Sequence, residues 1–165
     1  MNKSSIGQRV IGYWDTLRTK PGGKFLFSVL VGRVVPYSGS IGASVEELRP
    51  GHACLTLKDR RKVRNHLGSV HAIALANLGE LTTGLCAMAG MPPRTRAILR
   101  GLDVSYEKKA RGRLISTCAG DVVASEANTE HSFHAEIRDQ SGDIVARITT
   151  LWVIGPEVTD SNKPA

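Results

Sequence analysis

One carboxylate, Glu80, stands inside the most apolar stretch of the sequence, residues 69–89. A helix with almost no polar face is buried on nearly all sides, and an ionised carboxylate within it is costly unless it is paired, hydrogen-bonded or functional. Burial raises the pKa of such a group and makes its ionised form a stronger base or nucleophile. Asn77 and Thr83 lie three residues to either side of Glu80 and share one stripe of the helix. The pattern predicts either a catalytic carboxylate or a polar seam within a dimer interface.

The beginning of the same helix offers backbone chemistry. The N–H of Ala72 belongs to the unpaired donors at the positive end of a helix, where a developing oxyanion is stabilised. His71 precedes Glu80 by nine residues, and nine steps of roughly 100° put the two side chains on opposite sides of the helix. The two can therefore share one site only if two protomers build it. A single histidine at a helix start also often has a purely structural role.

The elements that must position these residues can be predicted from the surrounding patterns. Ser69 is the expected N-cap of the long helix, and Gly90, followed by two prolines, is the expected stop. Two short helices, interrupted at residues 21–23, precede a turn-rich connector at residues 36–42. Alternating apolar and polar residues predict six strands, near residues 41–48, 52–57, 102–106, 114–118, 133–137 and 144–152.

This order of elements predicts an α+β chain with the hotdog fold, in which a curved antiparallel sheet wraps around a long central helix. Consecutive strands joined by tight turns pair antiparallel, and a helix that is apolar all round needs the sheet to curl around it. Part of the helix stays uncovered in a monomer, which predicts a homodimer or a dimer of dimers. We expect an N-terminal helical extension over residues 1–40, a hotdog domain over 41–155 and a flexible tail over 156–165.

The composition restricts the class of protein. A chain of 165 residues with 41% hydrophobic residues fits one domain with a packed core. Its three scattered cysteines form neither a disulfide framework nor a zinc site, and the N-terminal charges do not fit a signal peptide. We expect reduced cysteines, no metal and a cytoplasmic location. The net charge of +7 favours a polyanionic partner, but only 5% of residues are aromatic and none alternates with the basic clusters, so nucleic acid is a weak candidate.

The motif before and within the long helix resembles the signature of hotdog-fold acyl-CoA thioesterases, and most resembles their phenylacetic-acid-degradation and 4-hydroxybenzoyl-CoA thioesterase branches. In that family an Asn or Gln stands six residues before a His and a Gly stands three before it. A small residue follows the His directly, and an acid follows it by nine. The resemblance covers about residues 41–155, and the N-terminal helices look like an extension found in an uncharacterised branch. The matching residues are Asn65, Gly68, His71, Ala72 and Glu80.

The resemblance implies thioester hydrolysis at a site shared by two protomers. Glu80 of one protomer would attack the carbonyl or activate a water, and the Ala72 N–H of the other would stabilise the oxyanion. Asn65 would orient the water or the carbonyl. The family usually has two glycines after the histidine, where this chain has Ala72 and an isoleucine. Many members have Thr or Ser at the position of Gly84, and the neighbouring Thr83 is the candidate to substitute for it. Coenzyme A enters as part of the substrate, and no other cofactor is implied.

Two basic clusters are either solvated surface or binding sites for the phosphates of coenzyme A, because guanidinium groups bind phosphate bidentately. The alternatives to a thioesterase are a non-catalytic acyl or acyl-CoA binding protein of the same fold, a hotdog dehydratase, and nucleic-acid binding. One cluster contains Lys58, Arg60, Arg61, Lys62 and Arg64, and the other contains Lys108, Lys109, Arg111 and Arg113.

The sequence leaves the acyl chain undecided. Phe25, Met88 and Trp152 are candidates for lining its pocket. Residues 1–35 could form a lid over that pocket, an oligomer contact or a contact with a membrane surface.

Overall fold

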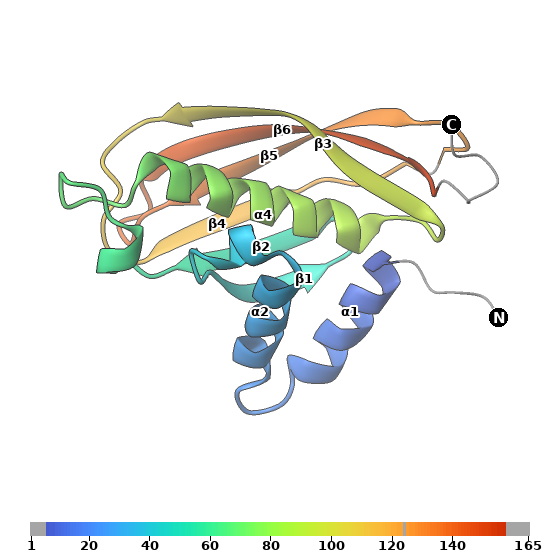
Figure 1. Ribbon diagram of the computed structural model, residues 1–165, viewed down its shortest axis with the longest axis horizontal. Helices are drawn as coiled ribbons and strands as arrows, with labels where there is room; N and C mark the ends of the chain where they lie inside the picture. Colours follow the sequence, from blue (N-terminus) through green and yellow to red (C-terminus); the bar gives the residue numbers. More distant parts are fainter. Residues whose placement is uncertain (1–5, 124, 158–165) are drawn as a thin grey trace.

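Six antiparallel strands form one curved sheet in the computed structural model, which describes residues 6–123 and 125–157 (Figure 1). The strand order is β1-β2-β4-β5-β6-β3, so that β1 and β3 are the two edges. All pairs are antiparallel, as tight turns between consecutive strands predict. The predicted tail lies outside the described residues from position 158 onward. The strands are β1 Ser44–Arg49, β2 His52–Leu57, β3 Thr95–Tyr106, β4 Leu114–Ala119, β5 Thr129–Arg138 and β6 Ile144–Pro156.

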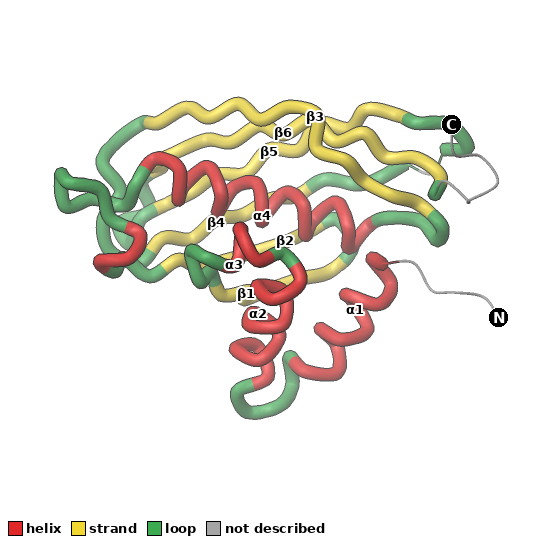
Figure 2. Tube along the Cα trace, in the orientation of Figure 1, coloured by secondary structure: helices red, strands yellow, loops and turns green. Residues whose placement is uncertain are grey.

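The long helix α4, Ala72–Gly90, crosses one face of the sheet (Figure 2). It ends at Gly90 as predicted, but the predicted N-cap is wrong. His71 caps the helix, because its Nδ1 accepts a hydrogen bond from the N–H of Ile73 at 3.1 Å. Ser69 lies two residues before His71 and donates, through both its N–H and its hydroxyl, to the side-chain oxygen of Asn65. Ser69 therefore stabilises the turn of the loop that precedes the helix and does not cap the helix.

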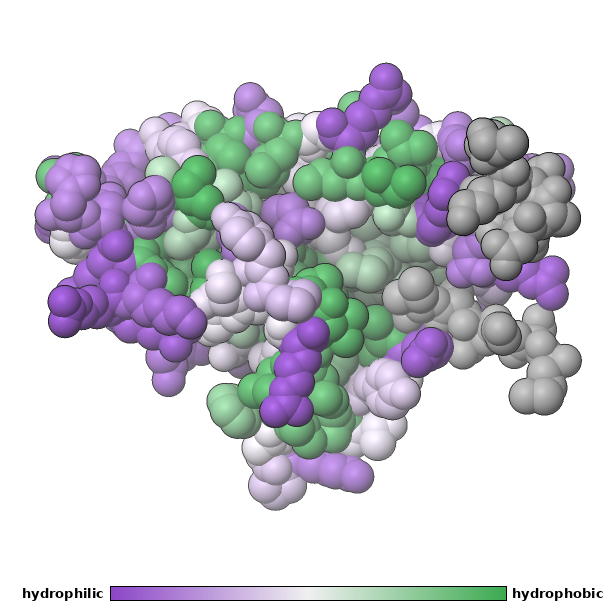
Figure 3. All heavy atoms as spheres, viewed as in Figure 1, coloured by the Kyte–Doolittle hydropathy of each residue, from purple (hydrophilic) through white to green (hydrophobic). Residues whose placement is uncertain are grey.

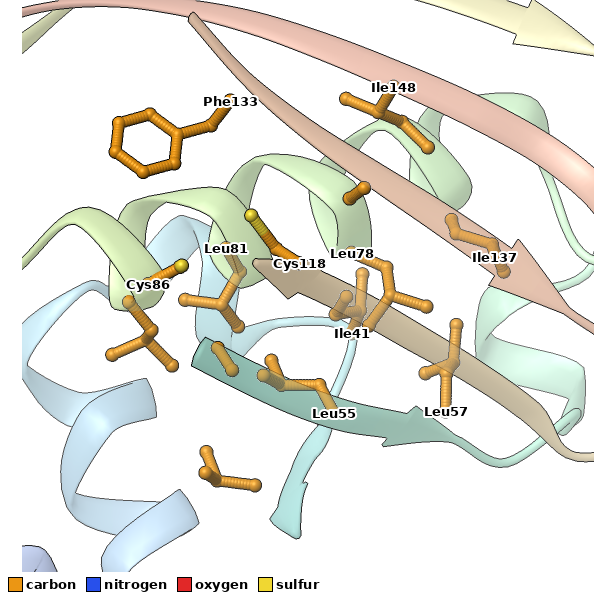
Figure 4. Close-up of a cluster of buried hydrophobic side chains, with 14 of the residues drawn as sticks. Ile41, Leu55, Leu57, Leu78, Leu81, Cys86, Cys118, Phe133, Ile137 and Ile148 are labelled. Carbon is orange, nitrogen blue, oxygen red and sulfur yellow. The ribbon is translucent and has the colours of Figure 1, made fainter. Parts of the chain in front are cut away.

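The core lies between α4 and the sheet, where Leu55, Leu78 and Ile137 are fully buried (Figure 4). The helix is long and apolar enough to cross a membrane, but 72% of its most apolar stretch is buried inside the protein, as in a core helix. It approaches the sheet closely at Gly79, where a Cβ atom would lie 2.4 Å from the side chain of Ile148 on β6. A glycine at this position lets the helix lie directly on the sheet.

The three cysteines are free. Cys86 of α4 and Cys118 of β4 are buried in the core cluster that Figure 4 shows, and Cys54 on β2 is half-buried. No group of three or more His, Cys, Asp or Glu side chains within residues 6–123 and 125–157 is placed to hold a metal ion.

Two helices at the N-terminus, α1 Ile6–Leu17 and α2 Gly23–Val34, confirm the predicted pair and its break. They join the main core, because Trp14 and Phe27 are buried in it and meet edge to face with ring centroids 5.1 Å apart. The predicted connector contains a further helical turn, α3 Pro36–Gly39, which starts with a proline at its first position. The sequence does not predict this helical turn, because four residues are too few to show a period.

The strand β3 begins at Thr95, seven residues before the predicted strand. A bulge in its pairing with β6, between Leu99 and Gly101, shifts the alternation by one residue. The pattern of apolar residues is therefore out of phase on the two sides of the bulge, and sequence alternation alone recognises the second half only.

Candidate active site

Glu80 lies half-buried on the face of α4 that α3 covers. The hydroxyl of Ser38 on α3 donates a hydrogen bond to Glu80 Oε2 at 3.4 Å. Burial raises the pKa of the Glu80 carboxyl, and the bond from Ser38 lowers it by less. No ion pair to Glu80 is found in the part of the chain that the structure describes. The carboxyl is thus poorly solvated and has no cation to stabilise its charge, which favours its action as a base or nucleophile.

Asn77, one turn before Glu80, also meets α3. Its side-chain nitrogen donates to the carbonyl of Tyr37 at 3.4 Å, and its side-chain oxygen is buried without a hydrogen-bond partner. A carbonyl can only accept, so the nitrogen must face Tyr37 and the oxygen must be the unpaired atom. Such a buried acceptor costs roughly 1–3 kcal/mol. It marks a position where a donor from another molecule would be stabilising.

Thr83 does not join this polar face. Its side chain is fully buried, and its hydroxyl donates to the backbone carbonyl of Glu80 at 2.9 Å. The stripe predicted from the sequence therefore divides into Asn77 and Glu80, which meet α3, and Thr83, whose hydroxyl is satisfied within the helix.

The loop before α4 is built around Asn65 and Gly68. The side-chain oxygen of Asn65 accepts from Leu67 N, Ser69 N and Ser69 Oγ, so its amide nitrogen is the part of the side chain left for a ligand. Gly68 closes the turn with a φ of +68°, a conformation that favours glycine.

The expected backbone donor, the N–H of Ala72, lies in the first turn of α4. The N–H of Ala72 is at the first helical position, where α4 itself offers it no acceptor. The hydroxyl of Tyr106, at the end of β3, donates to the Ala72 carbonyl at 3.0 Å and ties the sheet to the helix start. Because Nδ1 of His71 accepts from the backbone, the proton of its neutral ring is on Nε2.

The two parts of the predicted site are well separated within one chain. Ala72 and Glu80 are eight residues apart on α4, which corresponds to about 12 Å along the helix axis. One thioester carbonyl cannot contact both groups. A site that uses both must therefore combine the acid of one chain with the helix start of another.

The two basic clusters meet at the end of the molecule where α4 begins, and Figure 3 shows hydrophilic side chains gathered there. Asp59 joins them, because it pairs with Arg64 at 2.6 Å and accepts from Gly112 N at 3.0 Å. Lys108 forms ion pairs of 2.7 Å with both Asp139 and Asp143, so its charge serves the fold. The exposed side chains of the two clusters that make no hydrogen bond or ion pair to another described residue are Lys58, Arg61, Lys62, Lys109 and Arg111.

Arg60 is separated from this surface. Its guanidinium donates to the carbonyl of Ile41 at 2.5 Å and packs on Gly42, which has a φ of +61°. A Cβ atom at Gly42 would lie 2.1 Å from the guanidinium nitrogen. Arg60 thus lines a pocket beside α2, away from Lys62 and Arg64.

Two cavities lie on either side of α3. A groove of about 390 Å³ runs between α3, the start of α4 and the short 3-10 turn Arg61–Val63, with Tyr37, Lys62, Arg64, His71 and Asn77 among its walls. A pocket of about 280 Å³ lies between α2, α3 and β1 and includes Ser38 and Leu81. Glu80 is hydrogen-bonded to the helical turn that separates them.

No sequence pattern points to Ser38 or Tyr37 as site residues. Ser38 reaches Glu80 across 42 positions of the chain, and the short helix that carries it has no period. The one available signal is indirect, since an isolated acid in a buried helix needs a hydrogen-bond partner from somewhere.

Solved structures with the same architecture identify the class of fold. A structure described as genomics APC5556 is 32% identical to this chain, with a TM-score of 0.76, and covers 91% of this chain and 97% of that one. PA5026 from Pseudomonas aeruginosa, described as a protein of unknown function and probable thioesterase, is 21% identical with a TM-score of 0.70 and covers 79% and 93%. A mutant of the phenylacetic acid degradation protein PaaI from Thermus thermophilus is 18% identical with a TM-score of 0.61 and covers 72% and 97%.

The curved sheet and its long helix are the hotdog fold, as predicted, which this chain shares with these solved structures. Residues 23–154 match the family model described as a domain of unknown function, DUF4442, and the chain belongs to this family. The match includes α2 and α3. No curated protein matches the sequence.

Proposed function

We propose that the protein is an acyl-CoA thioesterase whose site is shared between two protomers. The observation that carries the proposal is the half-buried carboxyl of Glu80, which has a raised pKa and accepts one hydrogen bond, from Ser38. A cavity lies on either side of α3, the short helix that carries Ser38. The thioesterase names of solved structures with this fold support the reaction class.

The reaction uses groups from both chains. Glu80 of one protomer removes a proton from water, or attacks directly, and the new C–O bond converts the thioester carbonyl into an oxyanion. The Ala72 N–H of the partner protomer donates to that oxygen, while the Asn65 amide nitrogen orients the water or the carbonyl. Collapse of the tetrahedral carbon breaks the C–S bond and releases the coenzyme A thiolate, which takes up a proton. If Glu80 attacked directly, water then hydrolyses the acyl–Glu80 anhydride.

Coenzyme A extends along the groove at the helix start. Lys62 on its wall, with Arg61, Lys109 and Arg111 nearby in the basic clusters, supplies positive charge for the phosphates, while Arg64 on the same wall is paired with Asp59. The unpaired oxygen of Asn77 suits an amide N–H of the pantetheine arm. A soluble cytoplasmic substrate of this kind fits a cytoplasmic location.

The partner protomer is expected along the β3 edge. This twelve-residue strand pairs with β6 on one side only, and its Leu102 and Tyr106 side chains are nearly half exposed. A long edge strand with exposed apolar side chains readily pairs with a second copy. Two chains joined there form a homodimer, from which a dimer of dimers can be built.

The decisive experiment offers the purified protein a panel of short, medium, long and aromatic acyl-CoA thioesters and follows thiol release with a chromogenic reagent. We expect turnover, and a loss of about 10²–10⁴-fold in kcat for Glu80→Gln with the oligomer intact. The matched control is Glu47→Gln, because Glu47 is an exposed acid on β1. Tight binding without turnover would instead indicate a non-catalytic acyl-CoA binding protein of the same fold.

A further inference from the structure

We propose that the pocket between α2, α3 and β1 holds the acyl chain, so that the N-terminal helices determine the acyl-chain preference. This inference rests on the proposed function. The cavity of about 280 Å³ is near the lower end of the range for ligand pockets. The residues of α2 that line it are mainly apolar and include Phe25, Val29 and Val31.

The pocket opens beside the acid. Ser38 lines it and donates to Glu80 Oε2, and Leu81, the residue after Glu80, lines it from α4. A carbonyl carbon held at Glu80 therefore has an apolar cavity within reach on the same protomer. The basic groove lies at the start of α4, which the partner protomer contributes, so that the coenzyme A half and the acyl half of the substrate occupy different cavities.

The chemistry of the pocket favours a hydrocarbon chain over a polar ligand. Its inner polar groups already have partners, because Ser28 Oγ accepts from Val45 N at 2.8 Å and donates to the Lys24 carbonyl at 2.7 Å. Arg60 donates to the carbonyl of Ile41. No acidic residue is among the described residues that line the pocket. A polar ligand would find few free partners here, whereas an alkyl chain gains from leaving water.

The position of the pocket wall is fixed by a close contact between two helices. A Cβ atom at Gly39 would lie 2.3 Å from the carbonyl oxygen of Gly32, so α3 packs directly on the backbone of α2. The wall that carries Val29 is thus held at a defined distance from Ser38 and Glu80. A pocket with a fixed end should discriminate between chain lengths.

The test changes the depth of the pocket in both directions at Val29, which is half-buried. Val29→Trp fills the pocket and Val29→Ala deepens it, while Val34→Trp is the matched control, because Val34 is on the same helix but 81% exposed and outside the pocket. Binding of saturated fatty acids of increasing length is measured by calorimetry, and kcat/KM is measured for the matching acyl-CoA series.

We expect Val29→Trp to weaken the binding of longer chains at least about tenfold, since a few methylenes displaced from an apolar pocket have effects of roughly 10–200-fold. Val29→Ala should move the preference to longer chains, a gain that a damaged fold would not produce. Val34→Trp should leave both profiles unchanged. The proposal would be overturned if neither substitution at Val29 changed the chain-length profile, or if Val34→Trp changed it as much as Val29→Trp.

The two proposals fail in different ways. Fatty-acid binding that depends on Val29, without hydrolysis of any thioester, would support the acyl pocket and contradict the thioesterase. Hydrolysis whose chain preference is independent of Val29 would support the thioesterase and contradict this pocket.

Discussion

At the scale of single residues, the character of Glu80 comes from its surroundings. The raised pKa of its carboxyl comes first from burial, and Ser38 opposes that effect with one hydrogen bond of 3.4 Å. Because α3 supplies that hydroxyl, the strength of the acid depends on a segment far away in the sequence. Activity that needs the ionised carboxylate should therefore rise as the pH passes upward through this raised pKa.

Ser38→Ala tests this dependence. Loss of the hydroxyl removes the contact that lowers the pKa of Glu80, so the pKa rises further and a smaller fraction of the carboxyl is ionised at a given acidic pH. The acidic limb of the kcat/KM profile should move to higher pH, with little change on the plateau. Thr16→Ala, which removes an exposed hydroxyl from α1, serves as the control. An unmoved acidic limb would show that Ser38 does not set the acidity.

How much of the site can be predicted from the sequence depends on the range of the contacts. Glu80, Ala72 and Asn65 can be found because their spacing along one segment carries information. The capping role of His71 cannot be predicted in this way, since a side-chain nitrogen that caps a helix leaves no periodic signal. Ser38 was not found at all, because its contact is purely tertiary.

At the scale of elements, α4 lies close to the sheet because Gly79 has no side chain. Gly79 lies against Ile148, which is 1% exposed and has no room to move away. The helix would gain from alanine in its intrinsic propensity, but the close contact prevents it. The sequence predicts α4 because its apolar run is long and continuous, and it predicts most strands because their alternation is regular, yet the bulge within β3 interrupts that alternation.

Gly79→Ala should destabilise the protein by about 1–3 kcal/mol, the usual cost of an added methyl group in a packed core. The change is measured as the free energy of unfolding in denaturant. Gly12→Ala is the matched control, because a Cβ atom at Gly12 of α1 meets nothing within 4 Å. That variant should gain up to about 1 kcal/mol from helix propensity. Equal effects at the two glycines would disprove the packing argument.

At the scale of the whole molecule, the two sheet edges differ. The edge strand β1 is short, carries Glu46, Glu47 and Arg49, and packs beside α2. The edge strand β3 is twice as long, carries Arg96, Arg100 and Asp103 among its twelve residues, and exposes Ile98 and Leu102. A short strand in which half of the residues are charged is protected from pairing, whereas a longer edge with a lower density of charge and exposed apolar side chains favours it. The asymmetry indicates which edge meets a second copy.

Leu102→Glu should convert the dimer into monomers and abolish thioester hydrolysis, because the shared site would lose its second helix start. The mass of the particle in solution, measured by light scattering, and the rate of thiol release are the readouts. Ile115→Glu is the control, since Ile115 is 40% exposed but on β4 in the middle of the sheet. A monomer that stays fully active would contradict the two-protomer site.

The short helix α3 contacts Glu80 through Ser38 and Asn77 through Tyr37, and it separates the two cavities. A chimera that exchanged this turn and α2 for those of another family member would thus transfer substrate range and working pH together. Natural variation in these two properties should accordingly be inherited jointly, through changes in one short stretch of the gene.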